Sequence, residues 1–455
     1  MGDREQMLVD RGELEAELRR VGAALHGALP RASRNPIKAV DARAMEIASQ
    51  DERLRAALFR FVDVTPACRS LDDLARHLTG YLDEVGERPP PIEVAMRMSG
   101  TKPGRTALGA AAAAGVRHMA HRFIVGETPR KAMPVLRELW RDGAASSVDL
   151  LGEATITEAE ADRYAQRCAD ALEALVEAGE RLPERPVLER DSLGALPRAN
   201  LSVKVSALTP FLRPDAPELG RDDAARRLRP LLRSARDAGA HVHIDMESVD
   251  SLEATLSLIF ELLDEEEFAN GPSAGLVLQA YLRESSQELD QILAWAEASE
   301  RRPPLVIRLV KGAYWDHEVV EARQHGWSAP VFERKAESDL NFEELTRRLI
   351  DARPLVRPAI ASHNLRSVSH AIAYNRLTGG GDDDIELQVL RGLGDDLMHA
   401  LASLGFRVRV YCPVGDLVAG MAYLVRRLLE NTSNESFLNE QARGVPLEEL
   451  LAPPA

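Results

Sequence analysis

From about residue 145 onward, the hydrophobic positions change from helical spacing to short β-rich runs separated by amphipathic helical stretches such as 223–238 and 285–298. Alternating strands and helices of this kind indicate a parallel sheet. Eight repeats favour a closed (β/α)8 barrel of the TIM type, in the α/β class, over an open doubly wound sheet. The eight expected strands cover residues 147–151, 201–205, 242–245, 275–279, 305–309, 358–362, 385–389 and 407–411.

The first part of the chain shows helical periodicity and no convincing strand, and it includes an alanine-rich run at 109–115. We therefore expect three parts. Residues 1–144 form an N-terminal helical arm or accessory domain, residues 145–445 form the barrel, and residues 446–455 form a C-terminal tail.

Composition limits the classes of partner and compartment. The formal net charge of -15 argues against a nucleic-acid partner, since phosphate binding needs concentrated Lys and Arg. The three cysteines, Cys68, Cys168 and Cys412, are scattered without C-x-x-C spacing, so their spacing predicts neither a disulfide framework nor a structural zinc site. A reducing cytoplasm fits this cysteine usage, and the charged start of the chain shows no targeting segment.

Polar side chains stand at the ends of nearly all the expected strands. In a parallel barrel these positions converge on one end, where such folds keep their chemistry. Each residue alone could cap a loop or pair with a neighbour, but together they favour a ligand site, because burying charges near the barrel axis is costly otherwise. They are Lys204, Asp245, Gln279, Arg308, His363 with Asn364, Gln388 and Tyr411.

Two further patterns suggest ligands. After the last strand, Tyr423, Arg426, Arg427 and Glu430 share one helical stripe, either as a solvated face or as a double-arginine clamp for a carboxylate. Residues 308–315 combine two cations, a glycine and two aromatic rings, which suits an anionic cofactor with a planar ring system.

Several motifs in order, at 203–208, 277–281, 308–316, 362–364, 386–390 and 411–430, resemble the proline dehydrogenase domain of the proline utilisation A (PutA) flavoproteins. The resemblance implies a barrel that holds FAD and oxidises L-proline to 1-pyrroline-5-carboxylate, the first step of proline catabolism. It also implies hydride transfer to the flavin N5 and a quinone-type electron acceptor. A quinone in the membrane would imply peripheral contact of the protein with the inner face of the membrane.

The same resemblance assigns roles to residues of this sequence. The implied catalytic residues are Asp245, Lys204 and Arg308, with Arg308 near the flavin N5. The implied substrate pocket consists of Lys204, Leu390, Tyr411, Tyr423, Arg426, Arg427 and Glu430. The implied cofactor-binding residues are Met246, Gln279, Arg308, Lys311, Gly312, Ala313, Trp315, Ser362, His363 and Asn364.

The sequence also departs from the family pattern. Arg391 and Cys412 replace the usual His and Ala, and residues 246–248 after Asp245 differ from the usual family sequence. We therefore expect substrate preference rather than reaction type to differ. PutA chains continue into an aldehyde dehydrogenase domain, whereas this sequence ends at Ala455. We therefore expect one activity, with a semialdehyde dehydrogenase on another chain or absent from this sequence.

Three other interpretations remain open at this point. A metal-dependent hydrolase barrel would use the H-x-H of His241 and His243, although such enzymes place this motif on their first strand. A Schiff-base aldolase would use Lys204 as nucleophile. In a non-enzymatic interaction protein, the polar strand ends would be solvated loops.

Overall fold

The computed structural model describes residues 9–30, 51–86, 89–152, 154–416, 420 and 445–454. Its centre is a closed barrel of eight parallel strands in the order β1-β10-β9-β8-β7-β6-β5-β4. All eight expected strands and the barrel are confirmed, with strand ends that differ by a few residues. The strands are β1 (Ala144–Leu150), β4 (Asn200–Lys204), β5 (His241–Asp245), β6 (Ser273–Gln279), β7 (Leu305–Val310), β8 (Val356–Ala361), β9 (Glu386–Leu390) and β10 (Val408–Val414).

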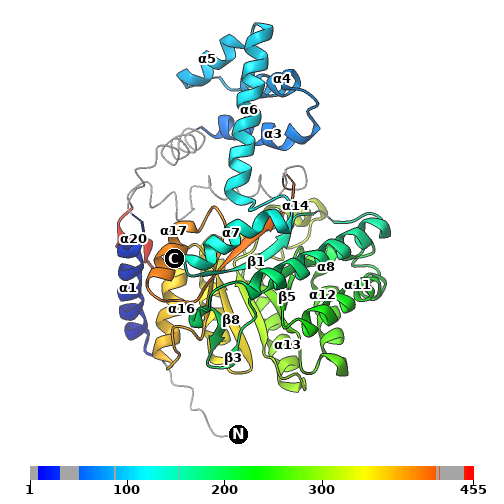
Figure 1. Cartoon of the computed structure of the whole chain (residues 1–455). Coiled ribbons are helices and arrows are strands. Elements are labelled where there is room, and N and C mark those ends of the chain that lie inside the picture. The colour runs from blue at the N-terminus through cyan, green and yellow to red at the C-terminus, as the bar shows by residue number, and fades with distance from the viewer. Residues whose placement is uncertain are drawn as a thin grey trace.

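Helices cover the outside of the barrel, between consecutive strands (Figure 1). They seal a core of Leu, Ile, Val and Ala side chains that lies between the strands and the helix layer. These helices are α8 (Glu158–Glu180), α11 (Pro217–Asp237), α12 (Leu252–Leu263), α13 (Ser285–Ala298), α14 (Trp315–His325), α15 (Lys335–Asp351), α16 (Leu365–Leu377) and α17 (Asp395–Ser403). Short helical turns occupy α9 (Pro186–Glu189), α10 (Val205–Leu208), η2 (Val249–Ser251) and η3 (Glu266–Phe268).

A small hairpin closes the amino-terminal end of the barrel. It consists of β2 (Arg190–Asp191) and β3 (Gly194–Ala195). Asp191 accepts hydrogen bonds from Arg357 Nε at 3.0 Å and from Arg407 Nη1 at 3.2 Å. This buried ion cluster fills one end of the barrel, and barrels of this kind bind their ligands at the opposite, carboxyl end.

The helices that precede the barrel lie in two places (Figure 1). Helix α1 (Arg11–Ala28) packs against α16 and α17 on the side of the barrel. There Arg366 forms an ion pair with Glu15 at 2.6 Å. Arg366 also donates to the carbonyl of Leu451, the residue that follows α20 (Leu447–Leu450). The arm projects from the barrel and is formed by α3 (Glu52–Val64), η1 (Thr65–Ala67), α4 (Leu71–Asp83), α5 (Pro90–Met98) and α6 (Lys102–Phe123). Helix α7 (Pro129–Arg141) leads from the arm to β1.

The alanine-rich run lies within α6 and lets this helix approach α4 closely. A Cβ built on Gly109 would lie only 1.9 Å from the carbonyl oxygen of Leu71. Small side chains are therefore needed where α6 crosses α4 in the arm.

Among the described residues, no helix is both long and apolar enough to cross a bilayer.

Candidate active site

The carboxyl end of the barrel holds a buried charged network centred on Arg308, which β7 places in the barrel interior. The Arg308 guanidinium donates to Gln388 Oε1 at 2.7 Å, to Asp245 Oδ1 at 2.7 Å, to Ser202 Oγ at 3.2 Å and to Ser147 Oγ at 3.3 Å. These four partners come from strands β9, β5, β4 and β1. The parallel arrangement of these strands thus brings residues that are distant in the sequence into one cluster.

Asp245 is the anionic counterpart of Arg308. Its Oδ1 also accepts from Ser202 Oγ at 2.7 Å, and its Oδ2 accepts from the Tyr411 hydroxyl at 2.7 Å. The Arg308 guanidinium lies 5.2 Å from the centre of the Tyr411 ring. This arrangement satisfies the buried carboxylate with three donors and fixes the Tyr411 ring beside the cation.

Lys204 lies at the rim of the same network, opposite Asp245 in the β4–β5 register. Its ammonium pairs with Asp149 and lies 3.8 Å from Asp245 Oδ2. Burial favours the neutral amine, but the attraction of Asp149 and then of Asp245 outweighs it and raises the Lys204 pKa above its usual value. Lys204 is therefore a fixed cation, whereas a Schiff-base nucleophile needs a neutral amine.

The Tyr411 phenol is held in its neutral form. Burial, followed by the nearby charges of Asp149 and Asp245, raises the Tyr411 pKa well above its usual value. The hydroxyl therefore keeps its proton and donates it in the hydrogen bond to Asp245.

A second polar cluster follows β7. Lys311 pairs with Asp339, and its ammonium lies 5.6 Å from the centre of the Phe342 ring. Burial lowers the Lys311 pKa, although Asp339 opposes this shift. Trp315 begins α14 at the surface and donates from Nε1 to the Phe332 carbonyl at 2.9 Å.

Gly312 gives this loop its shape. Its φ is 136°, and a Cβ built on it would lie 2.4 Å from atoms of the Tyr281 ring. Both the backbone conformation and the contact require glycine. The half-buried Lys311 and the exposed Ala313 on either side are thereby fixed at the carboxyl end of the barrel.

The ends of β8 and β9 meet beside this loop. His363 Nε2 accepts a hydrogen bond from the Leu390 amide at 2.9 Å, so its other ring nitrogen carries the proton in the neutral form. Asn364 caps α16 through its side chain, and Ser362 Oγ accepts from the Asn364 amide at 3.1 Å. These three residues therefore also have structural roles in the loop.

Two cofactor candidates from the sequence lie near β5 and β6. Met246 is buried directly after Asp245, and Gln279 donates from Nε2 to the carbonyl of Glu247 at 3.0 Å. The described candidates lie in the middle or the carboxyl-terminal part of barrel strands, or in the segments that follow them. Their binding roles remain predictions. Tyr423, Arg426, Arg427 and Glu430 lie outside the described residues.

Asp149, which the sequence pattern did not single out, is 1% exposed and forms the closest ion pair of Lys204. The expected first strand ran to residue 151, so this carboxylate lay inside an apparently apolar strand and was not counted among strand ends. Strand alternation offered a signal, because Ser147 and Asp149 share the face that points into the barrel. Ser202 on β4 was missed for the same reason.

The H-x-H pair does not form a metal site with neighbouring side chains. His241 Nδ1 lies 2.8 Å from Ser273 Oγ, and His241 Nε2 lies 3.1 Å from His243 Nδ1. Burial, with a further contribution from Arg409, lowers the His241 pKa to about 3, so this ring is neutral. Within the described ranges, the one group of three side chains that could hold a metal ion lies in the arm. We interpret the pair as packing inside the barrel, which argues against the metal-dependent hydrolase.

Comparison with family models gives two matches along the chain. A model described as proline dehydrogenase matches residues 132–440, and one described as the proline utilization A N-terminal domain matches residues 15–123. The first match covers the barrel and the second covers α1 and the arm.

Relatives and solved structures agree with these matches. Bifunctional protein PutA of Salmonella typhimurium is 34% identical over 350 residues, which cover 74% of this chain and 25% of the relative. Proline dehydrogenase of Deinococcus radiodurans is 29% identical over 321 residues, 70% of this chain and 89% of the relative. A crystal structure of PutA from Bdellovibrio bacteriovorus inactivated by N-propargylglycine superimposes with a TM-score of 0.88 at 36% identity, covering 97% of this chain and 44% of that chain. The matched region thus spans about a quarter of the length of the bifunctional relatives.

Proposed function

Because this chain belongs to the proline dehydrogenase family, we propose that it oxidises L-proline to 1-pyrroline-5-carboxylate with FAD as the hydride acceptor. The observation that supports this proposal most is the buried network of Arg308, Asp245, Lys204 and Tyr411 toward the carboxyl end of the barrel. The network combines cations for an anionic ligand with a rigid aromatic wall, and its residues are those that the PutA resemblance assigns to catalysis and substrate binding.

The residues present fit a flavin. A guanidinium has five N–H donors. Arg308 uses one from Nε, two from Nη1 and one from Nη2, which leaves one Nη2–H without an acceptor among the described residues. Gly312 lets the loop after β7 pack closely against the Tyr281 ring, and Lys311 adds a second cation in this loop. We propose that Arg308 faces the flavin ring and that the cofactor-binding residues assigned above line the rest of the cofactor.

When bound, FAD supplies the acceptor for the hydride that leaves the proline ring carbon next to nitrogen. The chain must then orient proline and stabilise charge. We propose that Arg426 and Arg427 hold the proline carboxylate in bidentate fashion, with Glu430, Tyr423 and Leu390 completing the pocket. Asp245 and Asp149 keep Lys204 protonated and in place, so this cation lies at the substrate end of the network.

The same cations act on the proton of the substrate. Proline must lose an ammonium proton before or during hydride transfer, and the positive charges of Lys204 and the double arginine lower the effective pKa of that ammonium. Turnover should therefore rise with pH toward this lowered value. Tyr411 is held by Asp245 as a neutral donor, so it shapes the pocket without competing for the proton.

We further propose that a quinone reoxidises the flavin, with peripheral contact at the inner face of the membrane and the rest of the protein in the cytoplasm. The product, 1-pyrroline-5-carboxylate, hydrolyses to a semialdehyde, which a semialdehyde dehydrogenase would consume. Relatives named "Bifunctional protein PutA" support the presence of such a partner activity.

The decisive experiment is an anaerobic titration of the purified protein with L-proline. We expect flavin absorption in the blue before the titration and its loss as proline reduces the flavin, with turnover when a soluble quinone analogue is added. Arg233→Met, which removes an exposed α11 cation paired with Glu267, is the matched control and should behave as wild type. Bound flavin that proline leaves oxidised would refute the proposal. Absence of flavin together with zinc bound at His241 and His243 would instead support the hydrolase.

A further inference from the structure

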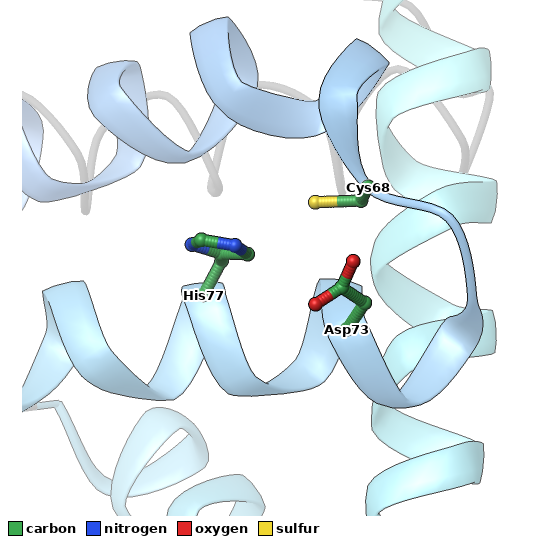
Figure 2. Close-up of side chains that lie close together, drawn as sticks. All are labelled: Cys68, Asp73 and His77. Atoms are coloured by element: carbon green, nitrogen blue, oxygen red, sulfur yellow. The ribbon is translucent and has the colours of Figure 1, made fainter.

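Cys68, Asp73 and His77 lie together in the helical arm, far along the chain from the barrel residues used above. Cys68 lies between η1 and α4, and Asp73 and His77 lie one helical turn apart on α4. Figure 2 shows their side chains directed into the same gap between the loop and the helix. One potential ligand atom from each residue lies within 4.8 Å of the other two.

Local structure fixes two of these groups. Ser70 caps α4 by accepting a hydrogen bond from the Asp73 amide, and the Asp73 carboxylate accepts from the Arg69 amide at 3.1 Å. A carboxylate held in this way is oriented as metal-ligating carboxylates commonly are. The Cys68 thiol donates to the Val64 carbonyl at the end of α3 at 3.5 Å, and Figure 2 shows its sulfur on the side of the loop that faces α4.

Arg76 would compete with a metal ion for the Asp73 carboxylate, but its ion pair with Asp73 is weak. Arg76 donates to Asp73 at 3.0 Å, but the Arg76 side chain is 65% exposed. Exposed pairs of this kind contribute little free energy, so a cation that needs the carboxylate can displace the arginine.

We propose that Cys68, Asp73 and His77 bind one zinc ion through the thiolate sulfur, a carboxylate oxygen and an imidazole nitrogen, with water as the fourth ligand. Thiolate and imidazole ligands together select zinc over magnesium or calcium, and three protein ligands plus water is a common zinc arrangement. Zinc–ligand bonds of about 2.0–2.3 Å place tetrahedral ligands roughly 3.3–3.8 Å apart. From the upper limit of 4.8 Å, the ligand atoms therefore need to approach one another by about 1.0–1.5 Å.

The ion would tie the loop after α3 to α4. Only the Cys68 Sγ–H proton leaves on binding, and the thiolate, carboxylate and neutral imidazole then donate electron pairs without any redox change. The site is separate from the proposed flavin chemistry, and each can fail without the other.

Cobalt and zinc titrations of the tag-free holoprotein test the proposal, after removal of metal with a chelator. We expect one cobalt per chain, visible absorption bands to the red of the flavin, and a thiolate charge-transfer band in the near ultraviolet. Zinc should displace the cobalt and raise the unfolding temperature of the arm. Cys68→Ser should remove the charge-transfer band, and His77→Gln and Asp73→Asn should weaken zinc binding at least about tenfold.

Two matched variants keep the test specific. His399→Gln changes an exposed histidine on α17, and Asp72→Asn changes the carboxylate next to Asp73 on α4. Both should bind zinc as wild type does. Failure of the wild type to bind cobalt, or a cobalt spectrum that Cys68→Ser leaves unchanged, would overturn the proposal, whatever the flavin titration shows.

Discussion

The Arg308 guanidinium and the Asp245 carboxylate lie 2.7 Å apart inside the barrel, although 62 residues separate them in the chain (308 - 245 - 1). Both residues are buried, and β6 lies between their strands in the sheet. A buried ion pair of this kind costs desolvation energy, so its main effect is to make each partner dependent on the other.

Replacing Asp245 with Asn should therefore destabilise the fold as well as impair activity. The change leaves Arg308 buried without its anion, and loss of one partner of a buried pair typically costs about 3–5 kcal/mol. Urea denaturation should show a correspondingly lower free energy of unfolding. Asp72→Asn, in an exposed ion pair of the arm, should change it by less than about 0.5 kcal/mol. Equal effects of the two variants would contradict the dependence of Arg308 on Asp245.

The buried carboxyl of Glu288 on α13 should make stability depend on pH. Its oxygens have no hydrogen-bond partner among the described residues, and burial raises its pKa to about 8. The folded state thus binds a proton that the unfolded chain releases above about pH 4.5, and stability is lost as the pH rises from 4.5 to 8. Glu288→Gln mimics the protonated form and should gain stability relative to wild type by up to about 1.4 kcal/mol per pH unit in this interval.

Denaturation curves at pH 5 and pH 8 measure this difference. Glu297→Gln, an exposed position on the same helix, is the control and should show no such trend. A constant difference between Glu288→Gln and wild type at the two pH values would rule out the buried, protonated carboxyl.

The barrel could be predicted because its strands are buried on both faces and therefore appear as continuous apolar runs between turns. The site was predictable in part, since strand-end polar residues converge in any parallel barrel. Asp149 was not predicted as a site residue because the hydrophobic pattern could not show where β1 ends. Periodicity also could not show that α1 packs on the barrel while α3 to α6 form the arm, because an apolar stripe reveals that a helix face is buried but not against what.

The metal-ligand group of the arm illustrates the same limit. Cys68 and His77 are nine positions apart and match no zinc spacing pattern, so the sequence predicted no site. The turn between η1 and α4 brings them together, and only the three-dimensional structure reveals this proximity.

Gly312→Ala should reduce the amount of FAD bound. The new methyl group would meet the Tyr281 ring and would also strain a backbone with φ of 136°, so the loop that carries Lys311 and Ala313 must move. The ratio of flavin to protein in the purified variant measures the effect. Gly326→Ala has a positive φ as well but meets no atom within 4 Å, so it separates a steric effect from simple backbone strain. Full flavin occupancy in Gly312→Ala would contradict the proposed cofactor loop.

Arg308→Met should lower the flavin reduction potential. A cation near the flavin stabilises the negative charge gained on reduction, and its removal makes reduction harder. We expect a shift of about 30 mV to more negative values, equivalent to roughly 1.4 kcal/mol for two electrons. Arg391→Met, at a half-buried position after β9 where the arginine pairs with Asp395 at 3.5 Å, should leave the potential unchanged. An unaltered potential in Arg308→Met would remove the proposed role of this residue.

Arg427→Met tests the double-arginine clamp, which rests on the sequence pattern alone. If Arg426 and Arg427 both hold the proline carboxylate, loss of one guanidinium removes charge-assisted hydrogen bonds worth about 2–3 kcal/mol, and KM for proline should rise roughly 30-fold to 160-fold. The methionine is similar in length, and Arg427 is not among the implied cofactor-binding residues, so FAD should remain bound and its absorption should match that of wild type. Steady-state kinetics at several proline concentrations separates KM from kcat. A KM equal to that of wild type would show that the stripe shared with Tyr423 and Glu430 is a solvated face, and the carboxylate would then have to bind to the remaining described cation of the substrate pocket, Lys204.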